Sequence, residues 1–232
     1  METSCVPHRI SKRLDTWCDA PMLKVLHVDA ILNPSLLEKY KMELTHHRHK
    51  DLARLTTQPE LDACRVPAGL FPGNLDEHHL LHEAPQTVLS SIADEGLMPS
   101  MGGSHIGTRY GDGTYLAVHA SKADSYTDVV FPGRAYNVCE ESAMEPRYIV
   151  VVRTFLGYCN RVVKYDPAWN HAKHAGKDSD GRFYDSVFAP GGQPGLDYPE
   201  IVKYNATQML PVAFVRYEHL DSCTCANCKS MI

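Results

Sequence analysis

The pattern of apolar positions along the chain predicts many short strands and few helices. Residues 147–156 are β-branched and apolar enough for the centre of a sheet, and residues 23–28 read as a further strand. Shorter strands are expected at residues 80–82, 114–118, 185–188, 200–204 and 211–217. Because the predicted helices precede most of the strands, the sequence indicates an α+β domain.

Two segments carry helix signals. Asn33 followed by Pro34 is typical of a helix start, and Leu36, Leu37 and Tyr40 then give an apolar stripe. The second predicted helix covers residues 84–96 and ends at Gly96, which can adopt the left-handed cap conformation. Its apolar face is expected to comprise Val88, Leu89 and Ile92.

The chain divides into a domain and two tails. Residues 1–22 are polar and interrupted by prolines, so we interpret them as an N-terminal tail; residues 23–220 form the domain, and residues 221–232 are a Cys-rich tail. Within the domain, the glycine-rich stretch 101–107 is expected to be a mobile surface loop. Residues 164–184 are polar and loop-like, with turn chemistry at residues 178–181.

Composition and charge exclude several classes of protein. The 232 residues are 44% hydrophobic and 22% charged, which is typical of a compact globular protein. A formal charge of -5 provides no standing basic field, so neither constitutive DNA binding nor attachment to an anionic membrane is expected. The longest apolar run, residues 148–152, is too short to span a membrane, and no secretory signal is visible. We therefore expect an intracellular protein, cytoplasmic or nuclear, with its eight cysteines reduced.

The histidines and cysteines raise the question of a metal site. His219 with Cys223, Cys225 and Cys228 could offer four ligands to zinc, but structural zinc sites usually draw on two separated ligand pairs. We favour a flexible thiol-rich tail, with an adaptor role for that tail as a further possibility. His46, His47 and His49 end the first helix, where solvent and the helix dipole explain them better than a metal does.

Six motifs occur in one order along residues 23–217. They are Ile31-Leu32-Asn33-Pro34 followed by Tyr40; Leu81-His82 ahead of Glu95-Gly96-Leu97; Tyr110-Gly111-Asp112-Gly113-Thr114-Tyr115-Leu116-Ala117; Ala120-Ser121-Lys122-Ala123-Asp124-Ser125-Tyr126; Tyr184-Asp185-Ser186-Val187; and Pro199-Glu200-Ile201-Val202-Lys203-Tyr204-Asn205. In this order they resemble the catalytic domain of the poly(ADP-ribose) polymerase family. The resemblance implies an ADP-ribosyltransferase-like fold, in which mostly antiparallel sheets form a split sandwich with a few helices around an NAD cleft.

The family's His-Tyr-Glu triad falls on His82, Tyr115 and Glu200. A carboxylate that starts a buried strand needs a partner or a chemical role, so Glu200 is the residue that packing alone explains least. By resemblance, His82 holds the adenosine ribose, and Tyr115 and Tyr126 sandwich the nicotinamide ring. Glu200 stabilises the cationic sugar of the transition state, and Lys122 lies near the reacting ribose.

Three positions depart from the family pattern. Glu83 stands where a glycine normally follows the histidine and clamps the nicotinamide amide, and it places negative charge near a ligand that carries a pyrophosphate. Ala84 replaces the Ser or Thr that often comes next. Ala123 replaces a serine that hydrogen-bonds the same amide, which costs about fivefold in affinity.

The expected function is NAD-dependent transfer of ADP-ribose to an acceptor with release of nicotinamide. NAD is the substrate, no metal is required, and the acceptor is a protein, including the chain itself, or a nucleic acid. The alternative is a catalytically weakened NAD- or ADP-ribose-binding pseudoenzyme or interaction module. The residues before His82 leave no space for the regulatory helical domain of DNA-damage members, so activation by DNA breaks is not expected.

Overall fold

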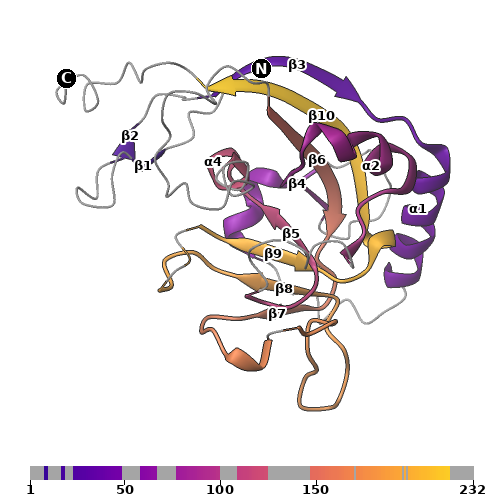
Figure 1. The fold of residues 1–232 in the computed structure, drawn as a ribbon. Coiled ribbons are helices and arrows are strands. Elements are labelled where there is room, and N and C mark those ends of the chain that lie inside the picture. The colour runs from indigo at the N-terminus through magenta and orange to yellow at the C-terminus, as the bar shows by residue number, and fades with distance from the viewer. Residues whose placement is uncertain are drawn as a thin grey trace.

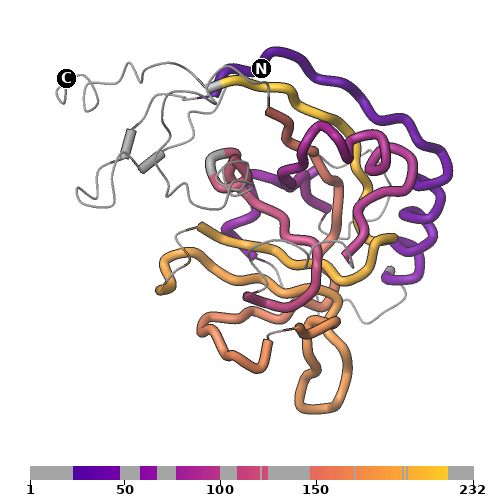
Figure 2. The backbone as a smooth tube through the Cα atoms, in the orientation of Figure 1, coloured from indigo at the N-terminus to yellow at the C-terminus, as the bar shows by residue number. Residues whose placement is uncertain are grey.

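A computed structural model describes residues 8–9, 17–18, 23–48, 58–66, 77–99, 109–124, 147–169, 171–194, 196 and 198–219 (Figures 1 and 2). The predicted glycine-rich loop, Tyr126 and the Cys-rich tail lie outside the described residues. Among the described residues, no helix combines the length and apolarity that crossing a membrane requires.

Within the described residues, eight strands form one sheet in the order β3-β10-β6-β4-β5-β9-β8-β7. Every neighbouring pair is antiparallel except β7 and β8, which are parallel. The bounds are β3 Leu23–Ala30, β4 Glu77–Glu83, β5 Thr114–Ala117, β6 Arg147–Phe155, β7 Cys159–Arg161, β8 Ser186–Ala189, β9 Glu200–Lys203 and β10 Met209–His219. Two short strands, β1 His8–Arg9 and β2 Trp17–Cys18, pair with each other. The prediction of an α+β domain with mostly antiparallel strands is confirmed.

The sheet consists of two four-stranded halves. Strands β3, β10, β6 and β4 run beside one another, and β5, β9, β8 and β7 form the second set at an angle to the first (Figure 1). Figure 2 shows β3 and β10 following each other along the outer edge of the first half. The halves meet between β4 and β5, where the ladder contains the single Cα pair Leu81 and Ala117. The sheet is therefore weakly joined at its middle.

The first helix begins at the residue that local sequence chemistry predicts, whereas the second, predicted over residues 84–96, begins only at Leu89. Helix α1, Pro34–Arg48, is capped by Asn33, whose Oδ1 accepts a hydrogen bond from the Leu36 amide at 3.1 Å. Helix α2, Leu89–Glu95, ends at Gly96 with φ 84°. The turn before it is a 3₁₀ helix, η3 Gln86–Val88, so Val88 does not continue the apolar face as predicted and is 39% exposed.

The remaining helical elements are short. Helix α4 covers Ala120–Asp124, and 3₁₀ helices cover Pro59–Cys64 (η2), Pro167–Trp169 (η5) and Ala206–Gln208 (η6). Consecutive residues of a strand point to opposite faces, so Ile149 and Val150 mark the two faces of β6. On one face, Val150 packs with Leu80, Leu116 and residues of α2; on the other, Ile149 packs with Ala117, Tyr217 and Ala123 of α4.

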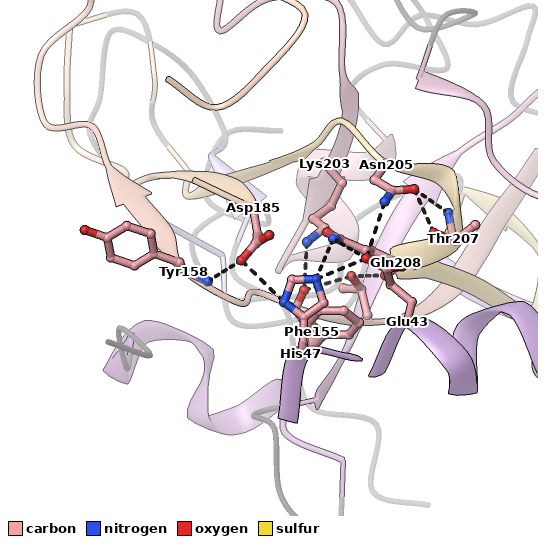
Figure 3. Close-up of polar contacts among 10 residues, drawn as sticks. Glu43, His47, Phe155, Tyr158, Asp185, Lys203, Asn205, Thr207 and Gln208 are labelled. Carbon is pink, nitrogen blue, oxygen red and sulfur yellow. Dashed lines mark hydrogen bonds and ion pairs between the residues drawn. The ribbon is translucent and has the colours of Figure 1, made fainter. Parts of the chain in front are cut away.

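The end of α1 carries a buried polar network (Figure 3). His47 is 3% exposed, with Nε2 3.1 Å from Glu43 Oε1 and Nδ1 3.5 Å from Asp185 Oδ2. Gln208 Nε2 donates to Glu43 at 3.1 Å, and Lys203 Nζ donates to the Phe155 carbonyl at 2.9 Å. The prediction that the histidines of this helix end face solvent is wrong for His47, because η6 and the start of β8 bring polar partners over it. His46 is exposed, as predicted, and His49 lies outside the described residues.

Candidate active site

His82, Tyr115 and Glu200 lie on three neighbouring strands, β4, β5 and β9. Ala117 of β5 pairs with Leu81 on one side and with Glu200 on the other. Neighbouring strands are about 4.8 Å apart, so β4 and β9 lie about 10 Å apart with β5 between them. Residues distant in the chain therefore lie on three adjacent strands of the sheet.

His82 closes the gap in the ladder between β4 and β5 with its side chain. Beyond the Leu81–Ala117 pair, residues 82–83 of β4 and residues 114–116 of β5 form no further Cα pair, and His82 Nδ1 lies 2.9 Å from the Tyr115 carbonyl oxygen. A carbonyl oxygen only accepts, so Nδ1 carries the proton. Burial lowers the pKa of His82, so the ring is neutral at pH 7 and Nε2 is an acceptor. The strand alternation places His82 on the opposite face from Tyr115 and Glu200, at the split between the halves.

The Tyr115 hydroxyl both accepts and donates a hydrogen bond. Its oxygen accepts from the Tyr110 amide at 2.7 Å, and its hydroxyl donates to the Gly111 carbonyl at 3.1 Å. Burial raises the pKa of Tyr115, and the nearby Glu200 charge raises it further. The hydroxyl is therefore a fixed neutral group, and the ring is locked in orientation.

Glu200 is buried and paired with Lys122. The residue is 4% exposed, and its Oε1 lies 2.8 Å from Lys122 Nζ of α4. The Lys122 side chain is itself 15% exposed. A buried carboxylate is costly unless it is paired, so α4 supplies the partner that the sequence required.

Glu83 follows His82 and faces a second carboxyl group. Asp124 of α4 accepts a hydrogen bond from the Tyr217 hydroxyl at 2.7 Å and lies 3.5 Å from Arg147 Nη1. Burial, together with the negative charge of Asp124, raises the pKa of Glu83 to about 7, and Arg147 opposes this shift. Glu83 is thus protonated in a large fraction of molecules at neutral pH.

We expect the Glu83→Gln variant to remove a pH dependence from folding stability. The folded-state pKa of Glu83 is about 7 against 4.5 ordinarily, so the folded chain binds more protons than the unfolded chain between these values. Wild-type stability should therefore fall as pH rises from 5 to 8, by on the order of 1 to 3 kcal/mol. Urea unfolding at both pH values measures this.

In the same measurement, the free energy of unfolding of Glu83→Gln should fall less between pH 5 and pH 8 than that of wild type. Glu95, exposed at the end of α2, provides the control, because Glu95→Gln should leave the wild-type pH dependence intact. Parallel curves for wild type and Glu83→Gln would show that Glu83 titrates normally.

The two alanines that depart from the family pattern are core residues. Ala123 is 2% exposed and packs with Ala117, Ile149 and Tyr217, and Ala84 is 3% exposed in the cluster on the α2 face. Packing accounts for both residues without any role in binding.

Several candidate residues cannot be placed. Tyr126, Cys223, Cys225 and Cys228 lie outside the described residues, and His219 ends β10 with its side chain undescribed. In the described ranges, no three His, Cys, Asp or Glu residues gather as metal ligands. Of the described cysteines, Cys64 and Cys159 form no disulfide.

The sequence did not single out Asp124, Arg147 and Tyr217, which surround Glu83. Asp124 stands inside the motif that contains Lys122, so the sequence could have pointed to it, but its hydrogen bond to Tyr217 depends on how α4 packs against the sheet.

Comparison with protein-family models gives no match, and comparison with curated proteins finds none that is similar.

Proposed function

We propose that the chain is an NAD-dependent ADP-ribosyltransferase of the poly(ADP-ribose) polymerase type, with the split-sandwich fold of that family. The observation that carries the proposal is the buried ion pair between Lys122 of α4 and Glu200 of β9. Strand β9 lies next to the strand that carries Tyr115 and two strands from the one that carries His82. A buried charged pair at the junction of two half-sheets adds little to stability on its own, which favours a chemical role for Glu200.

The proposed reaction breaks the bond between C1′ of the ribose and the nicotinamide nitrogen. The bonding electron pair leaves with nicotinamide, and positive charge develops on the ribose ring. Glu200 stabilises this charge because its carboxylate is fixed in a water-poor site before the reaction begins. Lys122 is a positioning residue in this scheme, since it holds the Glu200 carboxylate in one orientation.

The acceptor completes the reaction. A nucleophilic oxygen, nitrogen or sulfur forms the new bond to C1′, and its proton passes to Glu200 or to solvent. His82 Nε2, an acceptor in the neutral ring, is suited to a ribose hydroxyl. The locked Tyr115 ring offers one face to the nicotinamide, with Tyr126 as the proposed second face. Transfer to the chain itself, to another protein or to a nucleic acid is compatible with this scheme.

A binding module is the second candidate function. Ala123 has a methyl group where a serine would offer a hydroxyl to the nicotinamide amide, and Glu83 occupies the position of the clamping glycine. Both features weaken NAD binding at the nicotinamide end. Such a domain would retain NAD or ADP-ribose without turnover.

Incubation of the purified chain with NAD labelled in its adenylate part separates the two candidates. The transferase is expected to release nicotinamide and to become labelled itself, and mass spectrometry then identifies the modified residues. Saturable NAD binding without nicotinamide release would favour the binding module. The absence of both NAD binding and nicotinamide release would contradict both candidate functions.

A further inference from the structure

We propose that strand β3 is an interface between two copies of this chain, in which it pairs antiparallel with β3 of the second copy about a two-fold axis. This interface is independent of the proposed reaction, because β3 lies at the edge of the sheet, three strands from β4. The partner is therefore the chain itself, and the contact is a continuation of the sheet.

Strand β3 is an open edge of the sheet. It pairs with β10 along one side, and among the described residues no strand pairs with its other side (Figure 2). It is eight residues long, and every residue after Leu23 is exposed. The free side of an edge strand carries a row of backbone N–H and C=O groups that another strand can pair with. Strand β3 thus has the length and the free backbone groups to take up a further strand.

A β-bulge in β3 brings Val25 and Val28 to the same face of the sheet. Two residues three apart in a regular strand point to opposite faces, but the pairing with β10 skips Leu26, which is the extra residue of the bulge. Val25 lies opposite Tyr217. Val28 lies opposite Val215, and both of these β10 residues belong to the apolar cluster on the face on which α4 lies. Val25 and Val28 are each 54% exposed, so they form an apolar patch at the edge of this face.

The charged side chains of β3 lie on the other face. Lys24 pairs with Glu218 of β10, and its Nζ donates to the Glu218 carboxylate at 2.8 Å. Asp29 pairs with Phe214, which packs against the apolar cluster on the α2 face. Asp29 Oδ1 lies 2.9 Å from His27 Nε2. The α2 face of β3 therefore carries a positive charge near the start of the strand and a negative charge near its end.

These positions make β3 complementary to itself in one antiparallel register. A two-fold axis perpendicular to the sheet requires that residues opposite each other point to the same face, and the bulge satisfies this requirement. When Val25 lies opposite Val28 of the partner subunit, Lys24 lies opposite Asp29 of the partner subunit. The axis repeats both pairs, so two valine pairs form on one face and two ion pairs on the other. Apolar and opposite-charge cross-strand pairs both stabilise a sheet.

Self-complementarity is the reason for assigning the interface to a second copy. A strand of another protein would meet the charges of β3 in the right order only by its own sequence, whereas β3 supplies both members of each pair. Two-fold dimers with such self-complementary contacts are also the commonest form of soluble oligomer.

Sedimentation of the full-length chain at concentrations from about 1 to about 300 μM tests the interface. Wild type is expected to pass from monomer to dimer over this range. Val28→Lys places an ammonium group opposite Val25 of the partner subunit, so it should raise the Kd of the dimer about tenfold or more. Val28 is half-exposed in the single chain, and melting curves confirm that the variant is folded.

A charge exchange tests the register. Lys24→Glu and Asp29→Lys each set two like-charged pairs against one another, so each should raise the Kd about tenfold. The double variant, Lys24→Glu with Asp29→Lys, should return to a Kd near that of wild type, because the ion pairs form again with their charges exchanged. The contacts of Lys24 and Asp29 within one chain stay broken in the double variant, so recovery reports pairing between copies. Lys41→Glu, at an exposed ion pair on α1, is the control and should dimerise as wild type does.

Three outcomes would overturn the inference. Wild type could stay monomeric over the whole range, which would mean that β3 takes up no second copy. The dimer could keep its Kd in Val28→Lys, which would assign it to another surface. The double charge variant could dimerise no better than the single variants, which would exclude the self-complementary register on which the interface is built.

Discussion

The Glu200→Gln variant is expected to lower the rate of nicotinamide release by a factor of 10² to 10³ or more, with NAD binding changed by less than tenfold. Glutamine keeps the size of the side chain and loses only the charge. The ground state of NAD has no developing charge on the ribose, so in the proposed reaction the carboxylate acts mainly in the transition state. A large fall in rate with little change in affinity is the signature of that role.

The structure supplies a matched control. Glu218 on β10 also pairs with a lysine, Lys24, at 2.8 Å, but this pair is exposed and lies at the outer edge of the sheet. Glu218→Gln should therefore leave nicotinamide release unchanged. The rate is measured as the release of labelled nicotinamide under single-turnover conditions. Affinity is measured as the Kd of a carba analogue of NAD, whose glycosidic link cannot be cleaved.

The converse outcome is equally informative. If wild type releases nicotinamide and Glu200→Gln releases it at a comparable rate, Glu200 is not the catalytic carboxylate. A melting temperature close to that of wild type is required of the variant, because the substitution leaves Lys122 Nζ without its carboxylate partner. Replacing both residues, as Lys122→Met with Glu200→Gln, should restore stability without restoring turnover.

Local patterns predicted the elements well, because local chemistry determines them. Strand β6 follows its run of β-branched residues, and α1 begins where Asn33 provides a cap. The contacts of His47 are made by Gln208 of η6 and by Asp185, just before β8, which are distant from it in sequence. The pattern of polar and apolar residues within α1 therefore could not predict them. Val88 was misassigned for a related reason, since the 3₁₀ turn rotates it away from the face of Ile92.

The candidate site was predictable in its members and not in its geometry. The motif resemblance named Lys122 and Glu200, but their 2.8 Å contact requires the order β4-β5-β9 and the position of α4. Glu83 was predicted as a fixed negative charge, whereas burial beside Asp124 makes it titrate near neutrality. Electrostatic behaviour depends on the surroundings of a group in space, so a sequence states only which groups are present.

The strongest effect on stability is expected at the buried ion pair between Glu77 of β4 and Arg153 of β6. Glu77 at the start of β4 accepts from Arg153 Nε at 2.7 Å and Nη2 at 2.9 Å, and from the Tyr40 hydroxyl at 2.8 Å. Glu77 and Arg153 are 8% and 6% exposed. This cluster joins α1, β4 and β6, so it fixes the start of the strand that carries His82. Tyr40, which belongs to the first of the six motifs, therefore has a structural role as a hydrogen-bond donor to Glu77.

Glu77→Ala should lower the free energy of unfolding by about 3 to 5 kcal/mol, because it leaves the Arg153 guanidinium buried without its partner. The double variant Glu77→Leu with Arg153→Met should lose much less, since neither charge then remains buried. Urea unfolding at pH 7 measures both. Glu38 on α1 is the matched control: its pair with Lys41 is exposed, so Glu38→Ala should stay within about 0.5 kcal/mol of wild type. If Glu77→Ala cost no more than Glu38→Ala, water would have to reach Arg153, and the burial of the cluster of Tyr40, Glu77 and Arg153 would be wrong.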